Sequence, residues 1–341
     1  MKKILVTGGA GYIGSHTIVE IMERNAGEVI SADNYSNSTP KTFERIKTIT
    51  EKALKNYNID LCDASAVKQM FEENEGIDGI IHFAAFKFVG ESVENPLLYY
   101  HNNLESLVNI LRAVKEFKVP NFIFSSSCSV YGNIGKLPVN ESTALGAVSP
   151  YGYSKQVGER IVQDFAASTA SVKAVLLRYF NPTGAHVSGK IGEEPLQKPT
   201  NLVPVITQTA IGKIKEIVVH GNNYNTRDGT CIRDYIHVTD IARAHTDALA
   251  WLEKNKDSPA CSIFNLGSGN GVSVMEMINA FEKVSGKKLN YRIGPKRDGD
   301  VEAIYSDNTL VKNTLGWNPQ FTLEDMMLSA WKWELNMKEG A

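Results

Sequence analysis

The spacing of hydrophobic residues in the first half of the chain predicts strands and helices in alternation. Short apolar runs predict strands, and the longer stretches between them carry apolar residues at helical spacing. The predicted strands are Lys3–Thr7, Glu28–Asp33, Tyr57–Leu61, Gly79–Ala84, Asn121–Ser126 and Ala174–Phe180. The predicted helices are Ile13–Arg24, Thr42–Lys55, Ala66–Asn74, Leu97–Phe117 and Tyr153–Ala167. Such alternation is typical of parallel strands with right-handed crossovers, so we expect an α/β fold of the Rossmann type, a doubly wound parallel sheet with helices on both faces.

The pattern changes after Phe180. Residues Asn181–Thr200 are rich in Gly, Pro and polar side chains and predict a loop. The elements predicted beyond it are helices at Asn201–Ile211, Asp240–Trp251, Val274–Val284 and Leu323–Met337, and strands at Ile217–His220 and Cys261–Leu266. We therefore expect a cofactor domain over residues 1–180 and a smaller C-terminal α/β substrate domain over residues 181–341. The boundary is soft, because segments near 235–266 could return to the first domain.

Composition excludes several classes of protein. The 341 residues are 43% hydrophobic and 22% charged, with a formal net charge of −2, so the basic excess typical of nucleic-acid binders is missing. No apolar run approaches the ~18 residues that a membrane span needs. The four cysteines, at 62, 128, 231 and 261, lack metal spacing and are too few for a disulfide framework. We expect a cytoplasmic protein with reduced thiols and no metal site.

A glycine-rich turn follows the first predicted strand and opens the first predicted helix. It reads Thr7-Gly8-Gly9-Ala10-Gly11-Tyr12-Ile13-Gly14 and contains G-x-G-x-x-G. The first glycine of that motif permits a tight turn, the second lets a pyrophosphate approach the backbone, and the third allows close packing of helix on strand. The helix N-terminus then offers free N–H groups to the pyrophosphate of a dinucleotide.

Asp33, at the end of the second predicted strand, indicates which dinucleotide binds. Its carboxylate can accept hydrogen bonds from a ribose hydroxyl pair and would repel a 2′-phosphate, which favours NAD over NADP. Other strand ends should complete the site, at Asp60–Leu61 and at Phe83–Lys87.

Tyr151 and Lys155 place a phenol and an ammonium group one helical turn apart on the same face. An ordinary tyrosine is protonated at neutral pH, with a pKa of about 10. A nearby cation favours the phenolate, so we expect Lys155 to make Tyr151 a usable base. The strand that ends at Ser125–Ser127 would deliver a serine hydroxyl beside the tyrosine.

Together these features resemble the extended short-chain dehydrogenase/reductase family. Three longer segments, His82–Ser92, Leu177–His186 and Asp228–Val238, are similar to those of the UDP-glucose 4-epimerase family within it. The resemblance implies NAD-contacting roles for Gly8, Gly9, Gly11, Tyr12, Ile13, Gly14, Asp33, Asn34, Tyr35, Ser36, Asn37, Ser38, Asp60, Leu61, Phe83, Ala84, Ala85, Phe86, Lys87, Asn102, Ser125, Tyr151, Lys155 and Phe180. It implies UDP-sugar contacts for Ser127, Asn181, Asn201, Leu202, Val218, Val219, His220, Arg233, Arg297 and Asp300.

The resemblance also implies a reaction. Tyr151 takes the proton of the sugar 4-hydroxyl, directly or through Ser127, while tightly held NAD⁺ takes the hydride from C4. The 4-keto sugar then turns over and receives the hydride on its opposite face, which interconverts UDP-glucose and UDP-galactose in galactose metabolism. The family further implies a homodimer that packs through the helices near Leu97–Phe117 and Tyr153–Ala167.

Several alternatives stay open to different degrees. An epimerase for UDP-N-acetylglucosamine, UDP-glucuronate or a UDP-pentose would share the same first steps. A 4,6-dehydratase is disfavoured, because Ser127-Cys128-Ser129 stands where those enzymes carry an acidic pair. A reductase that uses NADPH is disfavoured by Asp33, and a non-catalytic NAD sensor by the intact Tyr151 and Lys155.

One position departs from the family pattern. Counting without a gap from Asp300 puts Ile304 where the family has a tyrosine or a cysteine that lines the sugar pocket. A shift of one residue would put Tyr305 there instead. Isoleucine is stiff at χ1 and offers no hydroxyl, so we expect the N-acetylated sugars to be poorer substrates.

Overall fold

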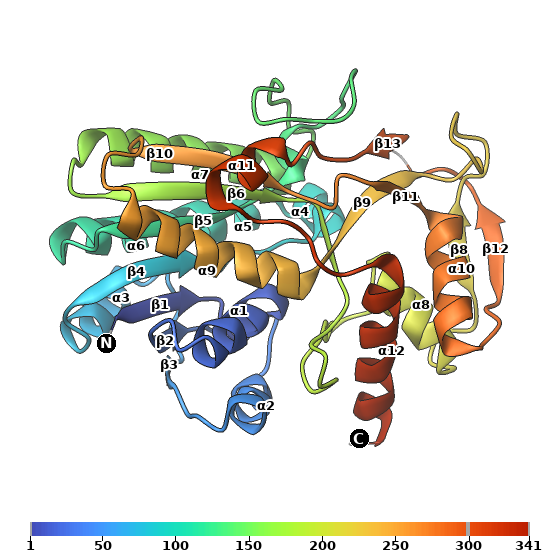
Figure 1. Ribbon diagram of the computed structural model, residues 1–341, viewed down its shortest axis with the longest axis horizontal. Helices are drawn as coiled ribbons and strands as arrows, with labels where there is room; N and C mark the ends of the chain where they lie inside the picture. Colours follow the sequence, from blue (N-terminus) through green and yellow to red (C-terminus); the bar gives the residue numbers. More distant parts are fainter. Residues whose placement is uncertain (1, 298–300, 340–341) are drawn as a thin grey trace.

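A seven-stranded parallel sheet forms the centre of the computed structural model, which describes residues 2–297 and 301–339 (Figure 1). The strands lie in the order β10-β6-β5-β4-β1-β2-β3. All neighbouring pairs run parallel. Their bounds are β1 Lys3–Thr7, β2 Glu28–Ala32, β3 Lys55–Tyr57, β4 Ile77–His82, β5 Asn121–Ser127, β6 Lys173–Tyr179 and β10 Cys261–Leu266. The predicted α/β fold is confirmed.

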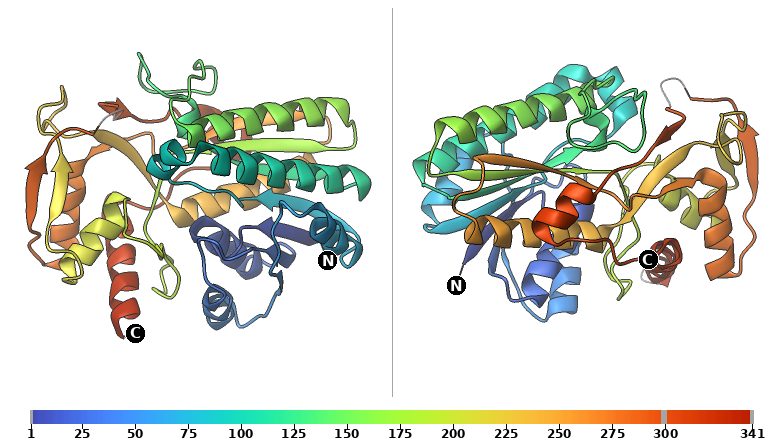
Figure 2. Two further views of the ribbon diagram at one scale, coloured as in Figure 1. Left: turned by 180° about the vertical axis from the view of Figure 1, so that it is seen from behind. Right: turned by 45° about the horizontal axis from the view of Figure 1, so that its top comes forward.

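Helices cover both faces of this sheet (Figures 1 and 2). Successive strand residues point to opposite faces, so Val6 of β1 packs in one apolar cluster and Leu5 in the other. On the Val6 face lie α1 (Tyr12–Glu23), α2 (Lys41–Thr50), α9 (Val238–Lys254) and α11 (Thr309–Leu315). On the Leu5 face lie α3 (Ala64–Glu72), α6 (Ser106–Glu116) and α7 (Pro150–Ser168). Burial on both faces explains why these strands read as continuous apolar runs.

The order of the strands reverses between β1 and β4. The chain leaves β1 toward β2 and leaves β4 toward β5, so the two connections diverge. In open α/β sheets, ligands bind in the crevice that such a divergence leaves at the carboxyl ends of the strands. The glycine-rich turn after β1 and the segment after β4 both begin at this point.

The chain after β6 contributes to two places. Strand β10 joins the large sheet by pairing with β6, and helix α9 packs on one face of that sheet. The other segments form a smaller sheet in which β9 (Ile232–His237) pairs with β7 (Asn181–Thr183), β11 (Gly271–Ser273) and β13 (Ala303–Ile304). Strands β8 (Ile217–His220) and β12 (Tyr291–Gly294) form a separate parallel pair. Helices α8 (Leu202–Ala210), α10 (Val274–Ser285) and α12 (Leu323–Glu339) share a second core.

Several predicted elements differ from the observed ones. The strand predicted at Tyr57–Leu61 ends at Tyr57, because Asp60 then folds an Asx turn in which its carboxylate accepts from Cys62 N at 2.8 Å. The helix predicted at Leu97–Phe117 is present without a gap from Pro96 to Glu116, as α5 (Pro96–Tyr100), a wider π-helical turn at His101–Glu105, and α6. The predicted loop at 181–200 contains the short strand β7. Helix α4 (Val89–Glu94) and strand β9 were not predicted.

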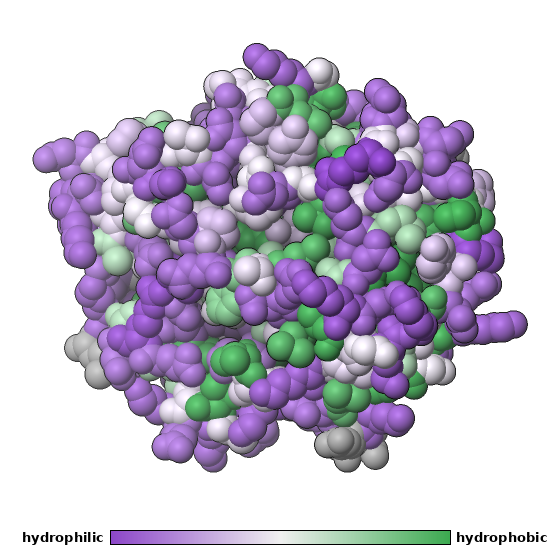
Figure 3. Space-filling model, turned by 45° about the vertical axis from the view of Figure 1, so that its right-hand side comes forward, coloured by the Kyte–Doolittle hydropathy of each residue, from purple (hydrophilic) through white to green (hydrophobic). Residues whose placement is uncertain are grey.

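The surface is mostly hydrophilic on the face drawn in Figure 3, where hydrophobic residues appear in patches among polar ones. Within residues 2–297 and 301–339, no helix combines the length and the apolar character needed to cross a membrane. The same part of the chain contains no group of His, Cys, Asp or Glu side chains arranged to hold a metal ion.

Candidate active site

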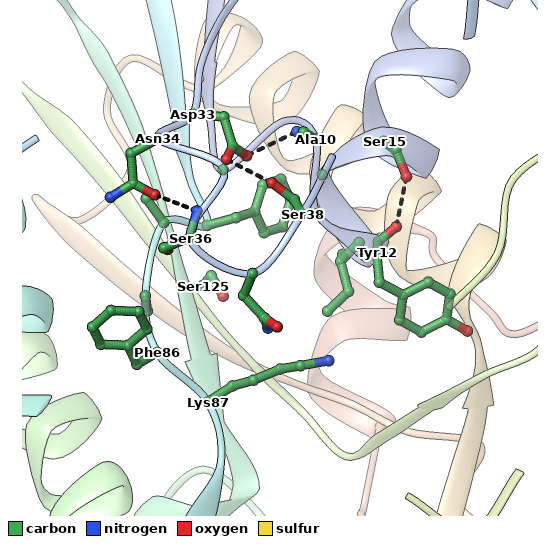
Figure 4. Close-up of a pocket in the computed structure, with 18 of the residues that line it drawn as sticks. Ala10, Tyr12, Ser15, Asp33, Asn34, Ser36, Ser38, Phe86, Lys87 and Ser125 are labelled. Atoms are coloured by element: carbon green, nitrogen blue, oxygen red, sulfur yellow. Dashed lines mark hydrogen bonds between the residues drawn. The ribbon is translucent and has the colours of Figure 1, made fainter. Parts of the chain in front are cut away.

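A cavity lies at the carboxyl edge of the large sheet, where β1, β2, β4 and β5 end (Figure 4). It brings together residues that lie far apart in the sequence, from Gly8 to Pro195. Of the residues expected to contact NAD, the cavity is lined by Gly8, Gly11, Tyr12, Ile13, Gly14, Asp33, Asn34, Ser36, Asn37, Ser38, Asp60, Leu61, Phe83, Ala84, Ala85, Phe86, Lys87, Asn102, Ser125, Tyr151 and Lys155.

Gly9, Tyr35 and Phe180, which were also expected at the cofactor, are not among the residues that line the cavity. A Cβ atom at Gly9 would come within 2.1 Å of Ser31 Oγ, so this glycine packs against β2. The Tyr35 hydroxyl accepts a 2.5 Å hydrogen bond from Asn56. Phe180 is only 2% exposed and packs in an apolar cluster beyond the end of β6.

The glycine turn has the close packing that a pyrophosphate cradle requires. Gly8 has a φ of +69°, and a Cβ there would lie 2.8 Å from Ala84 N. A Cβ at Gly14 would lie 2.2 Å from the Gly8 carbonyl oxygen. Helix α1 begins at Tyr12 without a side-chain cap from Gly11. The N–H groups of its first turn therefore suit the pyrophosphate of a dinucleotide.

Asp33 fastens the segment after β2 to the glycine turn. Its Oδ2 atom accepts a 3.0 Å hydrogen bond from Ala10 N, and its Oδ1 atom accepts one from Ser38 Oγ at 2.8 Å (Figure 4). The Oδ1 atom also accepts from Tyr35 N at 2.9 Å. An ionised carboxylate offers about four acceptor sites. Three are used inside the protein, which leaves capacity for a ribose hydroxyl at the cavity.

The segment after β4 is tied to α7 by a buried amide. Asn103 Oδ1 accepts from Phe86 N at 2.8 Å, and Asn103 Nδ2 donates to Phe86 O at 3.1 Å and to Ser154 Oγ at 3.0 Å. Asn103 and the lining residue Asn102 both lie in the π-helical turn, and such turns are frequent at functional sites. Asn102 thus lines the cavity, while Asn103 holds the segment that lines it next to α7.

Helix α7 carries Tyr151 and Lys155 along the cavity. The helix begins at Pro150, after Ser149, whose hydroxyl caps its first turn. Lys155 is 4% exposed, and its Nζ atom donates a 2.8 Å hydrogen bond to the Ser125 carbonyl. Ser127 lies at the end of β5, two residues beyond the lining residue Ser125.

The electrostatics of this pair differ from our expectation. Burial raises the pKa of Tyr151 to about 12, and hydrogen bonding with Ser127 opposes that rise. Burial also lowers the pKa of Lys155 to about 7, against the opposing charge of Glu159. Lys155 is therefore only partly charged near neutral pH. In the protein alone, burial is the largest influence on the pKa of both side chains, and it favours the neutral phenol rather than the phenolate that we expected.

The residues expected to contact a UDP-sugar lie mainly in the smaller sheets and helix α8. Arg233 on β9 and Ile304 on β13 are register partners. Asn201 precedes α8, and its Nδ2 atom donates a 2.7 Å hydrogen bond to Glu193 at the cofactor cavity. The structure does not bring the whole set together, because Val219 is 1% exposed within the second core. The remaining positions are Asn181 on β7, Leu202 at the start of α8, Val218 and His220 on β8, and the exposed Arg297; Asp300 lies outside the described residues.

Ile304 and the following tyrosine face different neighbours. Ile304 is 6% exposed and clusters with Val130 and Phe180, which follow the ends of β5 and β6. Tyr305 is half-buried, and a Cβ at Gly271 on β11 would lie 3.0 Å from its ring. Ile304 therefore lies on the side of the catalytic strand ends.

A loop that the sequence did not flag closes the cavity from the far side. Residues 191–195 line it together with Arg45 of α2. Arg45 forms an ion pair with Glu194 and lies 5.0 Å over the ring of Trp333. Trp333 Nε1 donates to the Glu193 carbonyl at 3.1 Å. These contacts join distant segments, and no local pattern in the sequence indicates them.

Comparison with known proteins identifies close relatives. The chain matches a family model described as GDP-mannose 4,6 dehydratase over residues 5–329. It is 47% identical over 338 residues to a UDP-glucose 4-epimerase of Bacillus subtilis (strain 168), an alignment covering 99% of this chain and 98% of that protein.

Two solved structures are similar along their whole length. A UDP-glucose 4-epimerase from Stenotrophomonas maltophila, with bound NAD and formylated UDP-arabinopyranose, gives a TM-score of 0.96 at 42% identity, covering 100% of both chains. A UDP-glucose 4-epimerase from Bifidobacterium longum, in complex with NAD⁺ and UDP, gives a TM-score of 0.93 at 44% identity, also covering 100% of both chains.

Proposed function

Because the chain belongs to the UDP-glucose 4-epimerases, within the extended short-chain dehydrogenase/reductase family, we propose that it interconverts UDP-glucose and UDP-galactose. The observation that carries this proposal is the convergence of Tyr151 and Lys155 with the glycine turn and Asp33 on one cavity. A dinucleotide site and an acid–base pair in the same cavity are what inversion at a carbinol carbon requires. The protein is thus an isomerase of galactose metabolism.

NAD is the cofactor, as in the solved relatives. The chemistry that it supplies when bound is reversible hydride transfer. The packed glycines and the uncapped first turn of α1 would hold its pyrophosphate, and Asp33 would hold a ribose. Epimerisation consumes no net reductant, so the cofactor need not leave. The loop at 191–195, bound to Arg45 and Trp333, is placed to retain it.

Tyr151 is the group that we propose exchanges the proton of the sugar 4-hydroxyl. A tyrosine whose pKa is raised by burial is a poor base by itself, so the positive charge of Lys155 is needed beside it. The carbonyl of Ser125 holds that ammonium in place. Ser127, whose hydrogen bonding lowers the pKa of Tyr151, either relays the proton or orients the hydroxyl.

The UDP-sugar is proposed to bind between the cavity and the smaller sheet. Residues 1–180 form the proposed cofactor domain, which α9 and β10 join, and the other segments of 181–341 form the proposed substrate domain. Arginine presents planar donors that match a diphosphate, which suits Arg233 and Arg297. Asparagine amides, at 181 and 201, can read sugar hydroxyls or a uracil edge. Asn201 supports this arrangement, because its bond to Glu193 lies next to the cofactor cavity.

A dehydratase would share the first hydride transfer, and the matching family model carries such a description. Elimination of water across C5–C6 needs an acid and a base at those carbons. Here β5 ends in Ser127, and Cys128 and Ser129 follow it, so neither carboxylate stands at this strand end. The residues present therefore favour epimerisation over dehydration.

Exposed apolar side chains lie on three neighbouring helices. Leu97 on α5 is 80% exposed, and Val93 on α4 and Tyr153 on α7 are also exposed apolar side chains. These helices contact one another, so the apolar positions lie on adjacent elements. We propose that a second copy of the chain covers them in a homodimer. A cytoplasmic location stays a prediction.

The test is to incubate the purified protein separately with UDP-galactose, UDP-N-acetylgalactosamine and UDP-galacturonate, and to identify the products by NMR. Formation of UDP-glucose from UDP-galactose supports the proposal. A 4-keto-6-deoxy product would identify a dehydratase. Conversion of only one of the other two sugars would identify an epimerase of different specificity.

A further inference from the structure

A fully buried ion pair lies directly behind the catalytic helix and strand. Glu159 follows Lys155 by one helical turn on α7, and Arg178 lies on β6. Their side chains are 1% and 3% exposed. Arg178 Nε donates to Glu159 Oε1 at 2.8 Å, and its Nη2 atom donates to Oε2 at 2.6 Å. The pair is therefore bidentate and shielded from water.

The ion pair also forms a hydrogen bond with the end of β5. Ser126 Oγ donates a short hydrogen bond to Glu159 Oε1. Ser126 is the register partner of Arg178 across β5 and β6. It stands between Ser125, whose carbonyl accepts from Lys155, and Ser127. Helix α7 thus holds two of the three consecutive serines, Ser125 through its backbone carbonyl and Ser126 through its hydroxyl.

On its other side the pair reaches a third strand. Arg178 Nη1 donates to the Tyr131 hydroxyl at 3.1 Å and to the Glu141 carbonyl at 3.3 Å. The Tyr131 hydroxyl donates to Asn265 Oδ1 on β10 at 2.6 Å. The network therefore runs from α7 through β5 and β6 to β10, and it includes the segment that follows Ser127.

Stability does not account for such a pair. Desolvation of two charges offsets most of their attraction, and replacing a buried pair by apolar residues is often neutral or stabilising. A role in fixing geometry and local charge explains its place better. We propose that Glu159 is a positioning residue, which sets a negative charge one helical turn behind Lys155 and holds Ser126, and thereby Ser127, at the end of β5.

Among the titratable groups near Lys155, we infer that Glu159 supplies the negative charge that stabilises the ammonium form. Tyr151 lies on the same helix, His82 ends β4 and Tyr179 ends β6. Burial lowers the pKa of His82 to about 3 and raises that of Tyr179, so both are neutral at physiological pH. The attraction of Glu159 opposes the burial that lowers the pKa of Lys155. Loss of this carboxylate should therefore deprotonate Lys155 at lower pH.

The experiment measures kcat and KM for UDP-galactose against pH in the NAD-bound enzyme and in Glu159→Gln. We expect kcat to fall about tenfold or more, since a misplacement of ~1 Å can cost ~100-fold. The alkaline limb of the kcat profile should move about one unit to lower pH, the lower end of a neighbouring charge effect. KM should change little. Glu159→Asp, which keeps the charge, should keep the wild-type limb.

Two further variants separate positioning from folding. The double variant Glu159→Gln with Arg178→Met removes both charges. It should be more stable to heat than Glu159→Gln alone, while the alkaline limb of its kcat profile stays at the lower pH of the single variant. Ser126→Ala keeps the ion pair, and should lower kcat without moving that limb. A double variant with the wild-type profile, or an unshifted limb in Glu159→Gln, overturns the inference. The inference rests on the proposed epimerase activity. A wild-type protein without that activity would contradict the proposed function rather than the role of Glu159.

Discussion

The ammonium group of Lys155 donates a 2.8 Å hydrogen bond to the backbone carbonyl of Ser125. This bond joins helix α7 to the end of β5 where both elements line the cavity. A backbone carbonyl has no freedom to turn away, so it fixes the ammonium more firmly than a side chain would. The bond holds Lys155 one helical turn from Tyr151, where we propose that it supplies positive charge.

Tyr151→Phe should lower turnover at least ~100-fold, the lower end for a positioned acid–base group. The substitution removes only the hydroxyl, so binding of UDP and NAD should survive. Steady-state assays and calorimetric titration with UDP measure the two effects separately. The matched control is Tyr153→Phe on the same helix, whose side chain is 49% exposed and which should keep near-normal turnover. Near-wild-type turnover in Tyr151→Phe would remove it from the base role.

Asp33→Ser should weaken NAD binding and relax discrimination against NADP. The change removes an acceptor for the ribose hydroxyls and a negative charge that repels a 2′-phosphate. It also breaks the bond from Ala10 N to Asp33, so some loss of affinity will be common to both cofactors. Titration of the apo-protein with each cofactor gives the ratio of affinities, which cancels that common loss. An unchanged ratio argues against the ribose assignment.

The cofactor half of this site could be predicted from sequence because its parts are local. The glycine turn and Asp33 each lie within a few residues of a strand end, and the tyrosine–lysine pair lies within the first turns of helix α7, where the hydrophobic pattern predicts their place. The loop at 191–195 could not be predicted, because it meets Arg45 and Trp333 only through tertiary folding. The displaced end of β3 has a local cause that the pattern missed, the Asx turn at Asp60.

Acidification should destabilise the fold through its buried histidines. Burial lowers the pKa of His16 to about 3 and that of His237 to about 4. Below the unfolded pKa of about 6.5 the unfolded chain binds protons that the folded protein does not, so stability falls with falling pH. One such group contributes up to about 1.4 kcal/mol per pH unit, from about pH 6.5 down toward its folded pKa.

Urea unfolding at pH 7, 6 and 5 measures this slope. His16→Gln should flatten it, whatever the variant does to stability at pH 7, and His101→Gln at an exposed position serves as control. Equal slopes in wild type and His16→Gln would contradict the assignment.

Leu97→Glu should shift the protein from dimer to monomer. Leu97 is 80% exposed on α5. An unpaired charge buried in an apolar interface would destabilise the dimer, because its desolvation is not compensated. Light scattering after size exclusion reports the mass directly. Leu335→Glu on α12, away from these helices, is the control and should leave the mass unchanged. A wild-type protein that is monomeric at micromolar concentration would refute the proposed dimer.

Substrate breadth should depend on Ile304. This side chain packs with Val130 and Phe180 beside the ends of the catalytic strands, while Tyr305 packs toward β11. A branched residue stiff at χ1 cannot move aside for an N-acetyl group at C2. Ile304→Cys should therefore raise the ratio of kcat/KM for UDP-N-acetylgalactosamine to that for UDP-galactose by roughly 10–200-fold, which is the discrimination that one contact in a hydrophobic pocket provides. Ile304→Tyr should lower this ratio. If both variants leave the ratio unchanged while Tyr305→Cys shifts it, Tyr305 is the residue that controls access.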